Sequence, residues 1–459
     1  MTGSAVPPPT TKREPPPKFV TGSTMRHVVV MTLTSAMGLS FMFLVDFLAL
    51  WWVSRLHSEI LITALGFAAT MQFFLVSIAI GMTIGAVALV SQTLGQGRPQ
   101  RARRIATTAL ILSVGAESCV AALAYVFRYD LLRLSGASGE ALHEAAGFLA
   151  IALPSLPLSA AGMTGSAILR ARGDAWRSMA VTSSAGLVAV FLDPLLIVVL
   201  GWGIEGAATV IVISRGVMAL VALYWLTGVH KMLTKPSLAD MRLYIGGYLA
   251  IALPAIATQV STPFGNWVLI RAMAEHGDSA VAGMGVVGRV MILAFGGIFA
   301  LSGAIGGIIG QNAGAGLRHR VQSAYLDALK FCAIYTGVVW VLLASLGGTI
   351  AQAFGLSGQG QYIVEVFCTY SAGSFVFTGA LFVANSAFNN LGRPFWATLT
   401  NWTRDGVLIG VLAFAMGALW GETGVVLAQA VANVLAGIGA GWIGWLLVKR
   451  GAGLAAGKP

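Results

Sequence analysis

Long, nearly uninterrupted apolar segments recur along this chain of 459 residues, many of them eighteen residues or longer. Each is long enough to cross about 30 Å of hydrocarbon as a helix, and a helix satisfies its own backbone hydrogen bonds there. Because 57% of the residues are hydrophobic and only 10% are charged, a water-soluble domain could not bury them all in one core. The sequence therefore predicts an all-α polytopic membrane protein.

Twelve such segments predict twelve transmembrane helices. The predicted spans are residues 27–54, 60–94, 105–127, 144–171, 178–200, 206–228, 243–274, 279–312, 322–346, 362–391, 395–418 and 424–448. The longest polar interval between them contains HKMLTKPSLADMR and marks the middle of the chain. We therefore predict a disordered cytoplasmic tail (1–22, rich in proline), an N-terminal six-helix lobe (23–228), a cytoplasmic linker (229–242), a C-terminal six-helix lobe (243–448) and a second cytoplasmic tail (449–459).

The two predicted lobes repeat each other. One constant shift along the chain places QTLGQGRPQR at 92–101 on QNAGAGLRHR at 311–320, and RARGDAW at 170–176 on NNLGRPF at 389–395. Such matches in order over more than a hundred residues indicate a duplication. Because six is an even number of crossings, both copies keep the same orientation, so we predict parallel repeats related by a pseudo-twofold axis along the membrane normal, with a central cleft between them.

The net charge of +11 follows the loops. If the N-terminus is cytoplasmic, that side of the membrane carries twenty of the 28 Lys and Arg residues, and the opposite loops carry four. The positive-inside rule then predicts that both termini are cytoplasmic and explains the basic charge without a nucleic-acid partner. We expect a multi-pass protein of the plasma membrane, in bacteria the inner membrane, that functions as a monomer.

Motifs for enzyme chemistry are absent from the sequence. The chain has no GxxxxGK[ST] loop for ATP, no HExxH motif, and three cysteines (Cys119, Cys332 and Cys368) at spacings that suit neither disulfides nor zinc. We therefore predict no enzyme activity, no cofactor and no metal site. Any transport would be driven by an ion gradient.

Carboxylates within apolar spans are the most informative polar residues, because inserting one costs about 2.5–3.5 kcal/mol and such residues usually line polar cavities. Asp193 lies in LVAVFLDPLLIVVL, where Pro194 removes a backbone donor. Asp46 lies in FMFLVDFLALWWV. We predict these two as ion-coupling residues. Glu117, among small neighbours, suits interhelical hydrogen bonding as well as transport.

Other polar residues within or beside spans are candidates of lower rank. We interpret Arg289 and Arg215 as partners or snorkelling residues, and Asp405 beside Arg404 as a helix-end pair. Spans 243–274 and 362–391 contain no mid-membrane acid, so the first lobe is expected to hold any ion site. The predicted substrate-cleft residues are amides, aromatics and one threonine: Trp51, Thr258, Gln259, Phe264, Asn266, Trp267, Asn385 and Asn389.

Five motifs together resemble the multidrug and toxic compound extrusion (MATE) family from about residue 27 to 448. They are ALVSQTLGQGRPQRARR, LRARGDAWRSM, LDPLLI followed by GIEGAA, ALPAIATQ, and IIGQNAGAGLRHR. The resemblance implies twelve helices in two lobes, a V-shaped cleft, and antiport of cationic or amphipathic compounds against H⁺ or Na⁺.

The same resemblance bears on single residues. Asp193 matches the acid of the family's fifth helix, and Ala189 replaces the asparagine four positions before it. In the first helix the expected aspartate falls at Ala49, and Asp46 lies one turn earlier on the same face. The first span lacks the family's proline, and the acids of the seventh and tenth helices are absent, with Thr258 at the first of these positions.

These observations favour a secondary active exporter that works by alternating access, with coupling through the N-terminal lobe. An alternative is a flippase for lipids or lipid-linked oligosaccharides of the same superfamily, which is expected to line its cleft with several cationic residues. A structural or receptor-like membrane protein is a third interpretation, and the duplicated lobes and buried acids argue against it.

Overall fold

The computed structural model describes residues 17–54 and 58–451, which form helices and no strand. Ten of these helices are long and apolar enough to cross a membrane, or eleven units if one bent pair counts as a single span. The longest unit, Pro394–Arg450, has 57 residues and loses helical geometry at Trp420 and Gly421. Its length of about 85 Å is far more than the roughly 30 Å of one crossing, so this break divides it into two. The fold is thus the predicted twelve-helix bundle.

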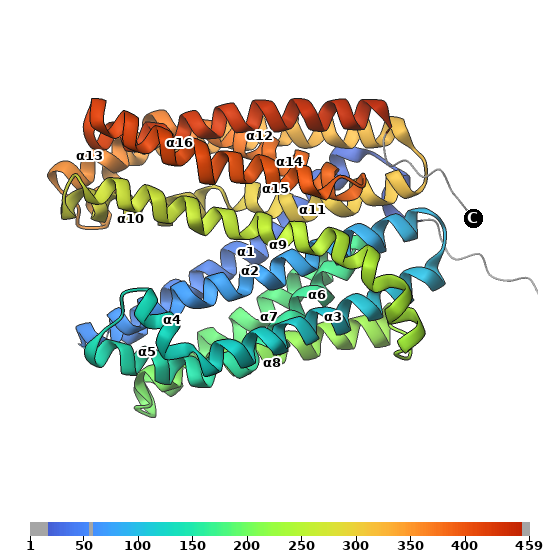
Figure 1. The fold of residues 1–459 in the computed structure, drawn as a ribbon, viewed down its shortest axis with the longest axis horizontal. Helices are drawn as coiled ribbons and strands as arrows, with labels where there is room; N and C mark the ends of the chain where they lie inside the picture. Colours follow the sequence, from blue (N-terminus) through green and yellow to red (C-terminus); the bar gives the residue numbers. More distant parts are fainter. Residues whose placement is uncertain (1–16, 55–57, 452–459) are drawn as a thin grey trace, which may run out of the picture.

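The N-terminal lobe, blue to green in Figure 1, contains six crossings. They are α1 (Thr24–Ser54); α2 (Glu59–Gly95); α3 (Pro99–Val126); α5 (Gly139–Ala152) with η2 (Leu153–Ser155) and α6 (Leu156–Arg172); α7 (Ala175–Asp193) with the π-helical turn η3 (Pro194–Val199); and α8 (Gly203–Tyr224) with the π-helical turn η4 (Trp225–Val229). The short helix α4 (Arg128–Leu134) connects α3 to α5.

The C-terminal lobe, yellow to red in Figure 1, repeats this order. Its elements are α9 (Leu238–Ala274); α10 (Asp278–Ala294) and α11 (Gly296–Gly314); α12 (Arg318–Ala353); α13 (Gly358–Val366) with η5 (Phe367–Ser371), η6 (Ala372–Ser374) and α14 (Phe375–Asn390); and α15 (Pro394–Trp402) with the π-helical turn η7 (Thr403–Leu408) and α16 (Ile409–Arg450).

The predicted span 279–312 is not one straight helix, because it bends by 47° between α10 and α11. A tyrosine from α12 enters the break: the Tyr335 hydroxyl donates to the Ala294 carbonyl at 2.9 Å and accepts from the Gly297 N–H at 3.3 Å. A side chain that replaces backbone partners in this way is a common cause of helix kinks.

The duplication is visible in the backbone. Gly97 and Gly316, which the repeat makes equivalent, have φ angles of 70° and 71°, and the equivalent Gly173 and Gly392 have 95° and 77°. Only glycine adopts this left-handed region without steric cost, which explains why these positions repeat in the sequence.

The two lobes touch at one end of the molecule and diverge toward the other (Figure 1). We call the touching end the basic end, because it carries the arginine-rich loops around residues 98–104 and 318–320, and the other end the distal end. Helices α1 and α2 of the first lobe contact α11 of the second, and α2 also contacts α9. The second half of α2 and nearly all of α11 are buried, whereas the first half of α2 has exposed and half-buried residues along most of its length.

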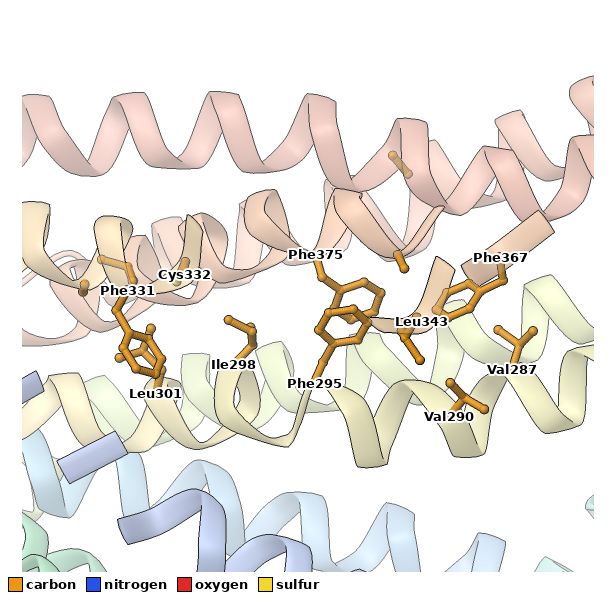
Figure 2. Close-up of a cluster of buried hydrophobic side chains, with 14 of the residues drawn as sticks. Val287, Val290, Phe295, Ile298, Leu301, Phe331, Cys332, Leu343, Phe367 and Phe375 are labelled. Atoms are coloured by element: carbon orange, nitrogen blue, oxygen red, sulfur yellow. The ribbon is translucent and has the colours of Figure 1, made fainter. Parts of the chain in front are cut away.

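Each lobe has its own apolar interior. In the C-terminal lobe, Phe295 at the α10–α11 break stacks on Phe375 with ring centroids 4.0 Å apart, and Phe367 meets Phe375 edge-on (Figure 2). Val287 and Val290 point from α10 into the same cluster, so this side of α10 faces the lobe interior.

Residues 17–22, which we predicted as part of a disordered tail, are ordered. Lys18–Val20 form the short 3-10 helix η1, and Phe19 is fully buried. The Phe19 N–H donates to Gln311 Oε1 of the second lobe at 2.9 Å, and Lys18 Nζ donates to the Gly173 carbonyl of the first lobe at 2.8 Å. The predicted tail therefore does not include this segment, which bridges both lobes because the apolar side chain of Phe19 is buried between them.

Candidate functional site

Asp193 is the last residue of α7 and is buried, with 2% of its surface exposed. The π-helical turn η3 begins at Pro194, which cannot donate a backbone hydrogen bond. The π-helical turn continues the span past the aspartate instead of ending it. The carboxyl group therefore lies within the membrane-spanning part of the N-terminal lobe and does not face lipid.

The face of α7 that carries Asp193 packs against α1. A methyl group on Gly186 would lie 3.2 Å from Val45 of α1, and Asp193 is seven residues, or about 20° of rotation, further along the same face. Ala189, between them, is buried in one cluster with Val45. Asp46 is the neighbour of Val45, but its side chain lies outside the described part of the structure.

A second polar group in this lobe joins four helical segments. Arg215 of α8 donates to the Ala152 carbonyl at 3.1 Å, to Ser155 Oγ at 2.9 Å and to Gln72 Oε1 of α2 at 2.6 Å. Glu117 of α3 is completely buried nearby, within electrostatic range of Arg215. Glu117 thus faces the lobe interior.

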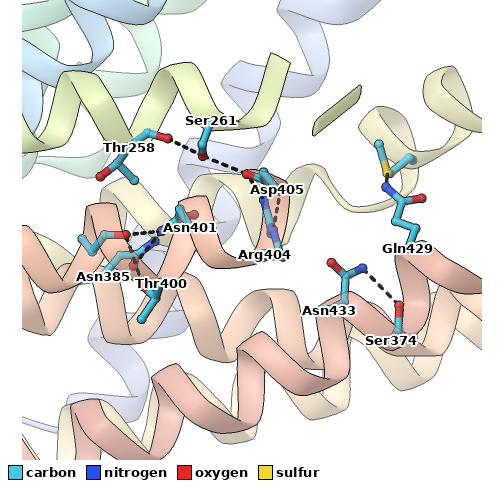
Figure 3. Close-up of polar contacts among 12 residues, drawn as sticks. Thr258, Ser261, Ser374, Asn385, Thr400, Asn401, Arg404, Asp405, Gln429 and Asn433 are labelled. Atoms are coloured by element: carbon cyan, nitrogen blue, oxygen red, sulfur yellow. Dashed lines mark hydrogen bonds and ion pairs between the residues drawn. The ribbon is translucent and has the colours of Figure 1, made fainter. Parts of the chain in front are cut away.

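The C-terminal lobe holds a buried ion pair (Figure 3). Arg404 donates from Nε to Asp405 Oδ1 at 2.7 Å and from Nη2 to Oδ2 at 3.0 Å, and Ser261 Oγ of α9 donates to the same Oδ2 at 2.8 Å. The aspartate is 2% exposed and the arginine 5%. Gly265 makes room for the pair, because a methyl group there would lie 3.0 Å from Asp405 Cβ.

Our interpretation of Asp405 and Arg404 as a helix-end pair is therefore wrong. Both lie in η7, in the middle of the crossing that runs from Pro394 to the break at Trp420, where the extra residue of the π-helical turn places both side chains inward. The second lobe thus contains a buried acid after all, but one already neutralised by its neighbour.

Three of the predicted substrate residues are bonded or enclosed within the C-terminal lobe. Thr258 Oγ1 donates to the Pro254 carbonyl and lies 3.1 Å from Thr398 Oγ1. Asn385 Oδ1 accepts from Asn401 Nδ2 at 3.0 Å, and Asn389 is 5% exposed. These side chains belong to the packing of α9, α14 and α15 in this conformation.

Two exposed aromatic residues, one on α2 and one on α9, lie beyond the point where these two helices contact each other. Gly81 of α2 packs on Ile256 of α9 so closely that a methyl group would lie 2.6 Å from the Ile256 backbone. Trp267 is eleven residues after Ile256, which places it about 20° away on the same face, three turns nearer the distal end. It is 57% exposed, and Phe74, seven residues before Gly81, is 38% exposed. Both side chains thus border the space between the diverging lobes.

The remaining predicted residues lie on α1, α9 and α10. Phe264 lies between Trp267 and Trp402, with ring centroids 6.0 and 5.4 Å away. Gln259 and Asn266 are half-buried on α9. Trp51 is 39% exposed and meets Trp52 edge-on at the distal end of α1. Arg289 is exposed on α10, away from Val287 and Val290.

Reciprocal contacts close the basic end. Gln92 Nε2 donates across the interface to the Asn390 carbonyl at 2.9 Å, and Gln311 Nε2 donates to the Ala171 carbonyl at 2.7 Å. The two donors occupy equivalent positions of the two repeats, and so do the two acceptors, so this is one contact made twice by the pseudo-twofold axis. The repeated glycines complete it: a methyl group on Gly95 would lie 2.0 Å from the Gln311 carbonyl oxygen, and one on Gly314 2.0 Å from that of Gln92.

An electrostatic cluster lies beside this end, outside the spans. Asp174 caps α7 by accepting from the Arg177 N–H, and its Oδ2 lies 2.6 Å from Arg177 Nη1 and 2.8 Å from His230 Nε2. Burial tends to raise the pKa of Asp174, but the hydrogen bonds from Arg177 and His230 outweigh it and lower the pKa. The pKa of His230 is lowered, mainly by burial.

Phe19, Gln72 and Ser261 were not predicted from the sequence as functional residues, and neither were the repeated glutamines Gln92 and Gln311. A signal existed for the glutamines and glycines, which recur in both halves. None existed for the other three, because each is a common residue whose partner lies far away in the chain.

Comparison with known protein families finds one family model that matches both lobes. The model of the MatE family matches residues 35–195 and 254–415, one match in each lobe. The starting points of the two matches are related by the same shift that superposes the repeated motifs.

Three known proteins illustrate the similarity. The FAD transporter of Shewanella oneidensis is 28% identical over 397 residues, covering 84% of this chain and 86% of that protein. The multidrug export protein MepA of Staphylococcus aureus is 24% identical over 416 residues, covering 88% and 89%. A solved outward-facing structure of a multidrug resistance MATE family transporter of the MOP superfamily has a TM-score of 0.90 at 21% identity, over 96% of this chain and 99% of that one, and so shares the fold.

Proposed function

Because this chain belongs to the MatE family of multidrug and toxic compound extrusion transporters, we propose that it exports amphipathic or cationic small molecules by antiport with H⁺ or Na⁺. Family and fold make it a multi-pass membrane transporter and not an enzyme. The driving ion, the antiport and the substrate are the proposal.

The observation that carries this proposal is the burial of Asp193 at the start of a π-helical turn within a membrane-spanning helix. An acid at 2% exposure is tolerated in hydrocarbon where its charge is compensated or comes and goes. Since α7 packs on α1, and α1 contacts α11 of the other lobe, an ion that binds Asp193 acts on a helix at the interlobe contact. Binding would thereby favour one arrangement of the lobes over the other.

The conformation described here suits one half of an alternating-access cycle. The Gln–Gly contacts close the basic end, while Trp267 and Phe74 stay exposed where the lobes diverge. The positive-inside rule places the basic end in the cytoplasm, so we assign this conformation to the state open to the outside. Exposed aromatic side chains there suit flat, amphipathic substrates.

Export of an aromatic anion is a second candidate. Arg289 is exposed on α10 and forms no ion pair with an acid of the described residues, and Arg271 lies 6.0 Å from the Trp267 ring. A guanidinium beside an aromatic ring can bind a phosphate and a flat ring system together. The name of the Shewanella relative, a FAD transporter, agrees with this chemistry.

Efflux from proteoliposomes tests both candidates. Vesicles loaded with ethidium or with FAD are placed under an imposed pH gradient or, separately, an Na⁺ gradient. The wild type is expected to release one substrate faster under one gradient. Asp193→Asn is expected to lose gradient-driven efflux ~10-fold or more, which corresponds to about 1.4 kcal/mol of lost coupling.

Asp130→Asn is the matched control, because this acid of the same lobe is 64% exposed and lies in α4, outside the spans. It should transport like the wild type. Gradient-driven efflux that survives in Asp193→Asn contradicts the ion-coupling role, and a wild type that responds to neither gradient contradicts antiport.

A further inference from the structure

Glu117 is a fully buried acid that has no role in the proposed ion coupling at Asp193. Its side chain has no exposed surface, and neither carboxyl oxygen has a hydrogen-bond partner among residues 17–54 and 58–451. The Ala79 backbone of α2 lies close to the carboxyl group but outside hydrogen-bond geometry. A charged carboxylate without a hydrogen bond is very costly to bury, whereas a protonated carboxyl group is far less so. The geometry therefore suits a neutral side chain in this conformation.

The neighbours of α3 offer few groups that could share the charge. Around Glu117, α2, η2 and α6 present no charged side chain, since the only charges of α6 are Arg170 and Arg172 at its basic end. From α9, the Tyr248 hydroxyl lies 2.9 Å from Ser113 Oγ, one turn before Glu117, and donates to the Met82 carbonyl. Within the part of the chain that the structure describes, Arg215 of α8 is the one charged group that acts electrostatically on Glu117.

Arg215 is engaged elsewhere in this conformation. Its guanidinium holds the α5–η2 junction through Ala152 and Ser155, and α2 through Gln72. α2 is the helix whose far end forms the Gln92–Gly95 contact with the other lobe. A change in the hydrogen-bond partners of Arg215 would therefore act on α2, which helps to close the basic end.

We propose that Glu117 is a second proton-binding site of the N-terminal lobe, occupied in this conformation, and that its deprotonation transfers Arg215 from Gln72 to the Glu117 carboxylate. The O–H bond of the carboxyl group breaks, the proton passes to water on the side then open, and the guanidinium neutralises the remaining charge. The inference deepens the proposed function by naming H⁺ as a coupling ion.

Infrared spectroscopy of the purified protein tests the site without any transport. In wild-type protein at pH 7, the carbonyl band of protonated carboxyl groups should be present and should lose the intensity of one carboxyl group in Glu117→Gln. Ser118→Ala is the control, because this neighbour is exposed and its hydroxyl donates to the Val114 carbonyl of its own helix. A band that is equally strong in Glu117→Gln, or absent from the wild type, overturns the proposal.

A second measurement tests coupling. The ratio of the two lobe arrangements, followed by distances between spin labels, should change with pH by a slope that counts the protons exchanged. Glu117→Gln should reduce this slope by about one proton per molecule, whereas Ser118→Ala should not. An unchanged slope overturns the coupling role. Failure of the proposed antiport is seen separately, as a wild type with the infrared band but without gradient-driven efflux.

Discussion

Replacing Gly95 by alanine should open the basic end of the transporter. The new methyl carbon would lie 2.0 Å from the Gln311 carbonyl oxygen, whereas ordinary contact begins at 3.4 Å. The lobes must therefore separate by about 1.4 Å at this point, because both groups belong to backbone and no rotamer change relieves the clash. Separation of this size also stretches the Gln92 and Gln311 hydrogen bonds, which span the same contact.

The magnitude follows from known costs of overpacking, about 1–3 kcal/mol for an extra methyl group in a packed interior. If the clash exists only when the basic end is closed, the ratio of open to closed molecules should rise by about 5- to 150-fold. Gly314→Ala should act in the same way on the Gln92 carbonyl. The double variant should add less than the sum, because the first methyl group already makes room for the second.

Distances between spin labels measure this ratio. Gln100 and His319 are exposed, begin α3 and α12, and are equivalent in the two repeats, so cysteines there report on the basic end. The exposed native Cys119 is replaced by serine. In Gly95→Ala the population with the longer distance should increase.

Gly66→Ala is the matched control, since Gly66 lies on the same helix and a methyl group there meets nothing within 4 Å. It corrects for the intrinsic preference of helices for alanine, about 1 kcal/mol. A distance distribution for Gly95→Ala that matches those of the control and the wild type would refute the assignment of this contact as the closed gate.

Two further predictions concern buried charges and pH. Asp405→Asn should lower the free energy of unfolding by about 3–5 kcal/mol because it leaves Arg404 buried without a counter-charge. The double variant Arg404→Leu/Asp405→Leu should recover much of this loss. A thermal unfolding midpoint of Asp405→Asn in detergent near that of the wild type contradicts the prediction. Because the pKa of His230 is lowered below its ordinary 6.5, the stabilisation from its neutral form is complete above pH 6.5 and is lost as the pH falls through the lowered value. The thermal unfolding midpoint of the wild type should therefore decrease as the pH is lowered from 7 to 5. An equally steep decrease in His230→Gln argues against this residue as the cause.

The twelve crossings and the duplication were readable in the sequence because each depends on local properties. Hydropathy acts on one segment at a time, and a repeated glycine such as Gly97 or Gly173 records a backbone angle that its own turn requires. The break at Trp420 and Gly421 likewise falls in the short gap between two predicted spans. The same local logic led us to place Asp193 within the membrane-spanning part of the chain.

What each polar residue contacts depended on helices distant in the chain, so no local pattern could decide it. Gly95 and Gly97 are two residues apart in one repeated motif. Gly95 nevertheless packs directly against the Gln311 backbone of the other lobe, whereas a methyl group on Gly97 would have no atom within 4 Å. Phe19, in a proline-rich segment, becomes a fully buried bridge, and Asp405 turns inward through a π-helical turn to face Ser261. Burial and pairing are properties of two surfaces brought together, and only the folded bundle brings them together.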